Sequence, residues 1–213
     1  MGVSFAKEAI LKNIRQALAH PVPVPFPQSE GNNSVFQPSV KELEVEFAEN
    51  FSGLLGRFSF CENEKELAAQ LYELAVAHKL KKIFCNEAGL IKTLSSAGFV
   101  NDYTDDLAAC HASITTCECL VARTGSILLS SATESGRTVS VYAPIHICIA
   151  YTNHLVYDIK DALQLVKEKY NDKLPSVISL ATGPSRTADI EKTLVVGVHG
   201  PKEVYVFLVE GCA

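Results

Sequence analysis

The chain lacks tryptophan, has a single methionine, and contains no apolar run long enough to cross a membrane. A transmembrane helix needs about 20 consecutive apolar residues, so the sequence predicts no membrane span. Residues 1–8 also lack a basic segment followed by an apolar one. We therefore expect no secretory signal and a cytoplasmic protein.

Positive charge is scarce as well. Lysine and arginine total 19 against 24 aspartates and glutamates, which leaves a formal net charge of -5. Because nucleic-acid binding needs a basic surface to neutralise phosphates, this balance argues against a nucleic-acid partner. The 213 residues, 47% of them hydrophobic, suffice for one domain with a substantial core, or for a domain plus an arm.

Nucleotide-binding and cluster-binding motifs are missing too. The chain has neither G-x-G-x-x-G nor G-x-x-x-x-G-K-[ST], so we expect no bound nicotinamide and no nucleotide hydrolysis. Seven cysteines are present, but none forms C-x-x-C, and their odd number suggests reduced thiols. Cys117 and Cys119 would share a strand face and could bind a metal with Cys110 or His111. Core packing is the favoured alternative, and we predict no metal and no cofactor.

The first 38 residues read as a helix followed by a proline-rich arm. Residues 5–18 carry apolar side chains at helical spacing. Four prolines between residues 21 and 27 then exclude helix and favour an extended conformation. Such an arm packs on its own domain or docks on a neighbouring subunit, so a homo-oligomer is one expectation. We divide the chain into this arm, residues 1–38, and a domain, residues 39–213.

The domain alternates helix and strand patterns. Helices are predicted over residues 40–55, 63–80, 87–97 and 158–170, with Asn63 and Asp158 as N-caps of the second and fourth. Strands are predicted over residues 57–61, 83–85, 125–130, 138–144, 145–150, 176–181 and 204–209. Residues 112–122 read as a strand, or as a short helix that leads into one. This alternation is typical of α/β folds. Because the middle strands follow one another closely, part of the sheet should be antiparallel. We expect one mixed sheet with helices on both faces.

The C-terminal stretch gathers polar residues at two glycine turns. An apolar strand ends at Gly183, a short helix is expected to start near Ser185, and the turn around His199 leads to the last apolar strand. We expect both strands to lie in the core of a sheet. Amides in the first turn of a helix lack intrahelical partners and attract anions. Arg186 can clamp a carboxylate or phosphate bidentately. The pattern therefore predicts that Gly183, Ser185, Arg186, Thr187 and His199 bind a small anion.

Other roles for these residues stay open. Ser185 and Thr187 could only cap the expected helix, while Asp189 and Glu191 favour its N-terminus electrostatically. His199 could act as an acid or base near neutral pH, or simply occupy a surface turn. His146 alternates with apolar neighbours in its strand, and is either a satisfied core histidine or a site residue.

Four blocks in order resemble the LUD-domain family: residues 124–128 (TGSIL), 143–147 (APIHI), 182–191 (TGPSRTADIE) and 197–201 (GVHGP). The resemblance runs over roughly residues 60–210. It implies a fold similar to the ribose-5-phosphate isomerase and coenzyme A transferase-like group. It also implies a role in oxidising L-lactate to pyruvate beside separate iron–sulfur subunits.

The same resemblance adds Thr124 and Gly125 to the ligand-binding candidates. Members of the family often have an acidic residue before this Thr-Gly pair, whereas the present chain has Arg123. That difference reverses the charge at one edge of the expected site.

Three functions are compatible with these features. The first is a non-redox subunit of a lactate-utilisation system, which binds a small anion, partner iron–sulfur subunits, or both. The second is a stand-alone enzyme acting on a coenzyme A ester or phosphosugar through Arg186 and His199, with Glu134 or Glu118 as a candidate carboxylate nucleophile. The third is a scaffold in which the polar motif residues are structural.

Overall fold

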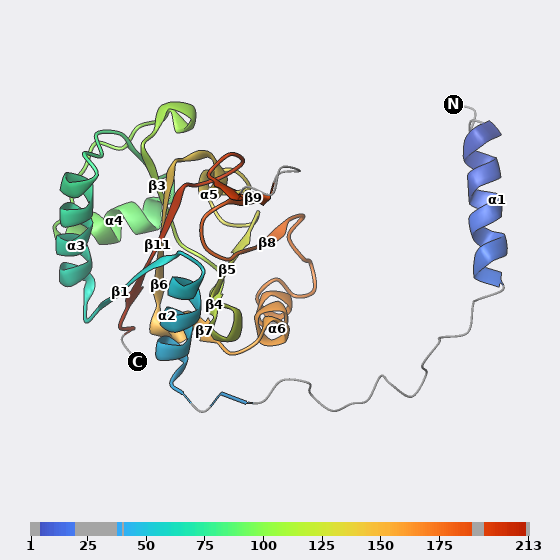
Figure 1. The fold of residues 1–213 in the computed structure, drawn as a ribbon, viewed down its shortest axis with the longest axis horizontal. Coiled ribbons are helices and arrows are strands. Elements are labelled where there is room, and N and C mark those ends of the chain that lie inside the picture. Colours follow the sequence, from blue (N-terminus) through green and yellow to red (C-terminus); the bar gives the residue numbers. More distant parts are fainter. Residues whose placement is uncertain (1–4, 20–37, 40, 189–193, 212–213) are drawn as a thin grey trace. The chain divides into compact units, whose positions relative to one another are not determined.

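The computed structural model describes residues 5–19, 38–39, 41–188 and 194–211 (Figure 1). It falls into two units, Met1–Pro38 and Ser39–Ala213. In the first unit, helix α1 spans Phe5–Ala19, as the apolar spacing predicted; most of the proline-rich arm lies outside the described residues. Within the described part of the chain, no helix combines the length and apolar character of a membrane span.

A five-stranded parallel sheet forms the centre of the second unit. Its order is β1 (Arg57–Cys61), β11 (Glu203–Val209), β6 (Ile145–Tyr151), β3 (Ala112–Thr115) and β2 (Ile83–Phe84). Parallel strands need crossover connections, and here helices supply several of them. Helices α3 (Glu64–Ala77) and α4 (Ala88–Ala97) cover one face of this sheet (Figure 1).

A second, four-stranded sheet packs on the other face. Its order is β7 (Leu155–Val156), β4 (Cys119–Val121), β5 (Ser126–Ser130) and β8 (Ile178–Ala181), with antiparallel pairs between β4 and β5 and between β5 and β8. Helix α6 (Ile159–Lys169) covers its outer face, and α2 (Leu43–Gly53) packs into the layer between the sheets. The expected α/β class is confirmed, but the strands are divided between separate sheets.

Alternation along the strands explains these layers. In β6, Ile147 and Ile149 pack toward α3 and α4, whereas Cys148 and Ala150 face the second sheet. In β11, Phe207 likewise belongs to the outer layer, while its neighbours face inward. Strands buried on both faces read as nearly continuous apolar runs, as the sequence of β6 and β11 does.

Helix starts follow the capping residues expected from the sequence. The Asn63 side chain accepts from the backbone N–H groups of Lys65 and Glu66 at the start of α3. Asp158 caps α6 in a reciprocal capping box with Asp161. Each such cap satisfies a backbone donor that has no partner inside the helix.

Three local predictions were wrong. Residues 138–144 were expected to be a strand, but Val139–Tyr142 form the short helix α5. The helix expected after Gly183 is absent from the described residues; instead Arg186–Ala188 form β9, which pairs antiparallel with β10 (Leu194–Val196). The strand before Gly183, expected in the core, is β8 at the edge of the second sheet and is only partly buried. β8 pairs with β5, and this long-range contact is not specified by any local pattern.

Candidate functional site

A cavity of about 400 Å³ opens near the amino ends of β6 and β11. It lies between α5, the end of β8, the turn after β8 and the turn before β11. Its lining residues are Leu129, Arg137, Ser140, Val141, His146, residues 179–186, His199, Gly200, Pro201 and Val204. Small-molecule sites commonly have volumes of roughly 300–1,000 Å³, so this cavity can hold a small ligand.

The charge of the lining has one sign. It contains two arginines, Arg137 and Arg186, two histidines, and the hydroxyl groups of three serines and one threonine. No aspartate or glutamate is among the described lining residues. Guanidinium groups and hydroxyls are the donors that carboxylates and phosphates require. The lining therefore suits an anion.

Backbone hydrogen bonds hold the two C-terminal turns together. The Ser185 N–H donates to the Pro201 carbonyl at 2.9 Å, and the Gly197 N–H donates to the Ser185 carbonyl at 2.9 Å. The Lys202 N–H donates to the Pro144 carbonyl at 2.8 Å, which joins the same turn to the one before β6. These bonds fix the walls of the cavity relative to the central sheet.

Gly183 is required by the close approach of two backbone segments. Its φ of +81° lies in the left-handed region, and a Cβ atom there would come within 2.4 Å of the Leu54 carbonyl oxygen. Only glycine adopts this conformation without strain and leaves room for that carbonyl. The contact positions the turn that carries Ser185 and Arg186.

The structure brings Gly183, Ser185, Arg186 and His199 to this one cavity. Arg186 and His199 are exposed, and neither side chain has a hydrogen-bond or ion-pair partner among the described residues. Within the described part of the chain, neither side chain is therefore committed to an internal contact. Arg137, by contrast, donates to the Ser176 hydroxyl, a contact that holds its guanidinium beside β8.

His146 is the most buried polar group of the lining, with 1% of its surface exposed. Its Nε2 lies 2.9 Å from the Thr115 hydroxyl. Burial lowers the pKa of His146 to about 4, so the ring is neutral near pH 7. The sequence left a core role and a site role open for this residue; the structure buries it and places it in the lining of the cavity.

The other predicted ligand residues lie outside this lining. Thr124 accepts from the Ser126 hydroxyl, which is also 2.9 Å from the Thr182 hydroxyl of the cavity. Gly125 has a φ of +57° and lies against the backbone of α2, where an added Cβ would come within 2.5 Å of the Phe51 nitrogen. Thr187 lies within β9.

The carboxylates considered as nucleophiles are engaged in other contacts. Glu134 accepts from the Ala88 N–H at the start of α4. Glu118 is buried and accepts from Lys169 at 2.7 Å, from Tyr170 at 2.8 Å and from Ser130. Burial opposes ionisation of Glu118, but these three hydrogen bonds outweigh it and lower its pKa. Neither residue is among the described residues that line the cavity.

Arg123 also has a structural partner. Its guanidinium donates to both carboxylate oxygens of Asp158 at 3.0 Å, and this pairing lowers the pKa of Asp158. Arg123, at the position where the resemblance implies an acidic residue, thus holds the N-cap of α6. It contributes no charge to the described cavity lining.

The described cysteines are buried and free. Burial raises the pKa of Cys61 and of Cys119 to about 12 and that of Cys85 to about 11. Because the thiolate is the nucleophile and the metal ligand, these thiols are held in the unreactive form. No group of three or more His, Cys, Asp or Glu side chains in the described ranges is arranged to hold a metal.

Several lining residues were missed from the sequence, among them two polar residues near α5. Arg137 and Ser140 come from the segment that was expected to form a turn and a strand. Because residues 139–142 coil into α5 instead, Ser140 faces the cavity. The Arg137–Ser176 contact spans 39 positions along the chain, so no local signal could have revealed it.

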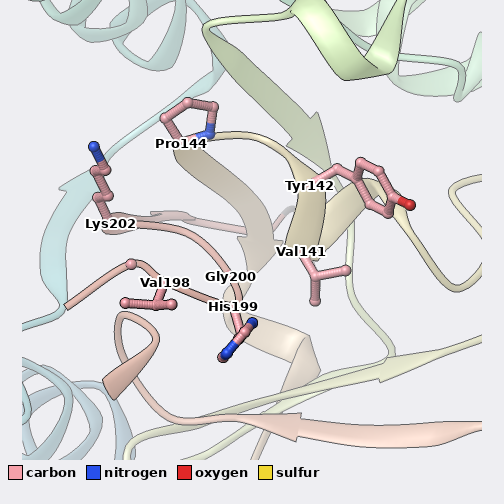
Figure 2. A pocket seen from close by; sticks show the side chains of 8 residues that line it. Val141, Tyr142, Pro144, Val198, His199, Gly200 and Lys202 are labelled. Atoms are coloured by element: carbon pink, nitrogen blue, oxygen red, sulfur yellow. The ribbon is translucent and has the colours of Figure 1, made fainter. Parts of the chain in front are cut away.

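A second depression, of about 380 Å³, adjoins the cavity and shares Val141, His199 and Gly200 with it. Figure 2 shows Val198 and Lys202 on one side of it and Val141 and Tyr142 on the other. The Lys202 ammonium points away from the His199 ring in this view (Figure 2). The two hollows therefore form one continuous surface with His199 between them.

Comparison with known proteins places this chain in a family. The family model described as LUD domain matches residues 45–209. The chain belongs to the LUD domain family. This match confirms the resemblance seen in the four sequence blocks and extends it toward the N-terminus.

Curated relatives of this LUD-domain chain match it over part of their length. Lactate utilization protein C of Bacillus licheniformis is 38% identical over 99 residues, which cover 46% of this chain and 41% of that protein. Lactate utilization protein C of a Geobacillus strain is 36% identical over 120 residues, 54% of this chain and 48% of that protein. An uncharacterized protein of Neisseria meningitidis is 36% identical over 92 residues, 43% and 39% of the two chains. The chain thus spans less than half the length of these relatives.

A solved structure shares the fold. The DUF162 family protein from Deinococcus radiodurans superposes with a TM-score of 0.58 and 19% sequence identity, covering 81% of this chain and 99% of that one. At this identity the likeness concerns the fold alone. The relation to the ribose-5-phosphate isomerase and coenzyme A transferase-like group stays a prediction.

Proposed function

We propose that this chain is a non-redox component of a lactate-utilisation system that binds a small carboxylate anion and associates with iron–sulfur subunits. The names of its relatives from Bacillus and Geobacillus support the lactate-utilisation role. The iron–sulfur partners follow from the family resemblance. The protonated state of the buried thiols favours a non-redox role for this chain.

The anion-binding proposal rests on the excess of positive charge among the described residues that line the cavity. Arg186 has no partner among the described residues, and no carboxylate competes for it within the described lining. A guanidinium binds a planar carboxylate through two parallel hydrogen bonds. The hydroxyls of Ser185 and Thr182 can serve a second oxygen, and Leu129 and Val204 offer apolar contact to a short carbon chain.

The size of such a ligand limits its affinity. A ligand of about six non-hydrogen atoms, such as lactate or pyruvate, gains at most about 1.5 kcal/mol per atom. Even at that ceiling, binding is about micromolar, and a less complete fit brings it into the millimolar range. Titrations should therefore extend to millimolar concentrations of the acid.

Calorimetric titration with L-lactate, pyruvate and inorganic phosphate tests the proposal. We expect one of the two carboxylic acids to bind, and Arg186→Ala to weaken that binding about tenfold or more, because hydrogen bonds to charged groups contribute about 1.5–3 kcal/mol. Arg15→Ala is the matched control, since Arg15 is an exposed arginine of α1. No binding by the wild type, or unchanged binding by Arg186→Ala, would show that the cavity is not the site.

Association is tested separately by co-expression. The full chain should co-purify with the iron–sulfur subunits of a lactate-oxidising system. A chain that elutes alone while those subunits are present and folded contradicts the subunit role. The titration result does not depend on this outcome.

The adjoining depression supports a second candidate, a longer anion such as a phosphosugar or a coenzyme A ester. A ligand of this length would place its second anionic group on the side of Lys202 (Figure 2). In that case a phosphosugar or acyl-coenzyme A should bind more tightly than lactate in the same titration. Lys202→Ala should then weaken the longer ligand and leave lactate unaffected.

A further inference from the structure

His146 lines the cavity, and one of its ring nitrogens is not used by the contacts described so far. The ring is almost fully buried and lines the floor of the cavity. Its Nε2 is bonded to Thr115, while its Nδ1 has no hydrogen-bond partner among the described residues. This nitrogen is not among the fully buried side-chain atoms of the described residues that lack a partner, so it is accessible from the cavity, where water or a ligand can accept its hydrogen.

The contact with Thr115 determines which nitrogen carries the proton. Thr115 is fully buried in β3, and within the described chain its hydroxyl is hydrogen-bonded to His146 Nε2. Buried hydroxyl hydrogens are normally donated, so Thr115 donates to Nε2. A neutral imidazole that accepts at Nε2 carries its hydrogen on Nδ1. The floor of the cavity therefore offers a neutral N–H donor.

We propose that the ring N–H of His146 donates a hydrogen bond to the group on the second carbon of the ligand, next to its carboxylate. This contact selects acids that carry an oxygen at that carbon over acids that carry an ammonium group there. This proposal rests on the function proposed above. Arg186 takes the carboxylate, and the Nδ1–H of His146 meets the neighbouring group. A 2-oxo or 2-hydroxy oxygen accepts that hydrogen. The ammonium of a 2-amino acid has no lone pair to accept it, and lies unfavourably beside two guanidinium groups.

Three acids of nearly equal size test this selection. Pyruvate, L-lactate and L-alanine differ at the second carbon, where they carry a carbonyl, a hydroxyl and an ammonium. In calorimetric titrations of the wild type, we expect alanine to bind at least about tenfold more weakly than the better of the other two. Alanine binding as tightly as lactate and pyruvate would overturn the proposal.

Two substitutions separate the two ring nitrogens. In His146→Asn the side-chain amide lies near the position of Nδ1, and in His146→Gln it lies near that of Nε2. His146→Gln should keep the contact with Thr115, lose the donor to the cavity, and bind pyruvate and lactate about tenfold or more weakly. His146→Asn should bind them more tightly than His146→Gln does. Melting temperatures show whether both variants are folded.

Nitrogen NMR of the ring in the ligand-free wild type gives a readout that needs no variant. We expect the neutral ring with its proton on Nδ1 near pH 7; the other tautomer or a charged ring there would overturn the proposal. If the wild type binds none of the acids, the proposed function fails together with this selection. If it binds pyruvate or lactate and His146→Gln binds them equally well, only the role of His146 fails.

Discussion

The burial of a neutral histidine predicts that the protein loses stability in mildly acidic solution. The pKa of His146 is lowered by burial from 6.5 to about 4. Between these values the unfolded chain binds a proton that the folded chain does not. Stability therefore falls as the pH drops from the unfolded pKa toward the folded one, and the contribution is fully present only above that range.

The size of the loss follows from the two pKa values. Integrating the proton difference from about pH 7 to about pH 5 gives a loss of about 2 kcal/mol in the free energy of unfolding. The full difference of the two pKa values corresponds to about 3 kcal/mol, reached near the folded pKa. We choose the upper part of the range because carboxylates titrate mainly below it.

Urea unfolding of the wild type and of His146→Gln at both pH values isolates this contribution. The other histidines and the carboxylates are present in both proteins, so their effects largely cancel in the comparison. We expect the wild type to lose about 2 kcal/mol more than the variant between the two conditions. An equal loss in the two proteins would refute the premise that His146 is buried and neutral.

Two further predictions concern the frame around the site. Gly125→Ala should lower the free energy of unfolding by about 2 kcal/mol or more, because a left-handed φ and the α2 backbone both oppose a side chain there. Gly89→Ala in α4 is its control, with an expected change of less than about 1 kcal/mol because nothing lies within 4 Å. Glu118→Gln should lower the free energy of unfolding by about 1–3 kcal/mol above pH 5, because it removes the carboxylate that Lys169 and Tyr170 bind. This difference between wild type and variant should shrink as the pH falls below 4.5, the carboxylate's ordinary pKa. Urea titrations measure both, and Glu73→Gln, an exposed glutamate of α3, should show little change at either pH.

Local sequence signals predicted the elements whose stability is local. The α3 helix begins after Asn63 and α6 after Asp158, because each side chain caps backbone donors within a few residues. The apolar runs of β6 and β11 predicted buried strands for the same reason: every residue of the run is apolar enough to be buried on either face. Such features depend on neighbours along the chain.

The elements that were mispredicted depend on distant contacts. Residues 186–188 pair with residues 194–196, and this pairing outweighs the helix signal of a proline and a serine after Gly183. β8 pairs with β5 in the second sheet, more than 45 positions away along the chain. The division of the strands into two sheets is likewise set by which strands meet. A local pattern gives the type of a strand and leaves its partner open.

The alternation of side chains along β6 predicts which way His146 points, but not what lies opposite it. Because Ile145 and Ile147 belong to the outer layer, His146 must point toward the second sheet, and the sequence allows that inference. The paired strands set its neighbours: Ser113 of β3 on one side and Val204 of β11 on the other. The sequence could not show that the second sheet leaves an open space opposite His146, since that depends on where β8 ends.

The position of His146 gives a physical reason to expect a polar ligand next to it in the cavity. A histidine in a dry layer between two sheets would need partners for both nitrogens, and the strand register supplies one of them, Thr115. Leaving the other nitrogen without an acceptor would cost about 1–3 kcal/mol, which an apolar residue at this position would avoid. A water molecule can accept this hydrogen bond when the cavity holds no ligand. An anion whose oxygen replaces the water keeps the hydrogen bond and adds the attraction of Arg186, so the same geometry that tolerates a buried imidazole also favours a carboxylic acid.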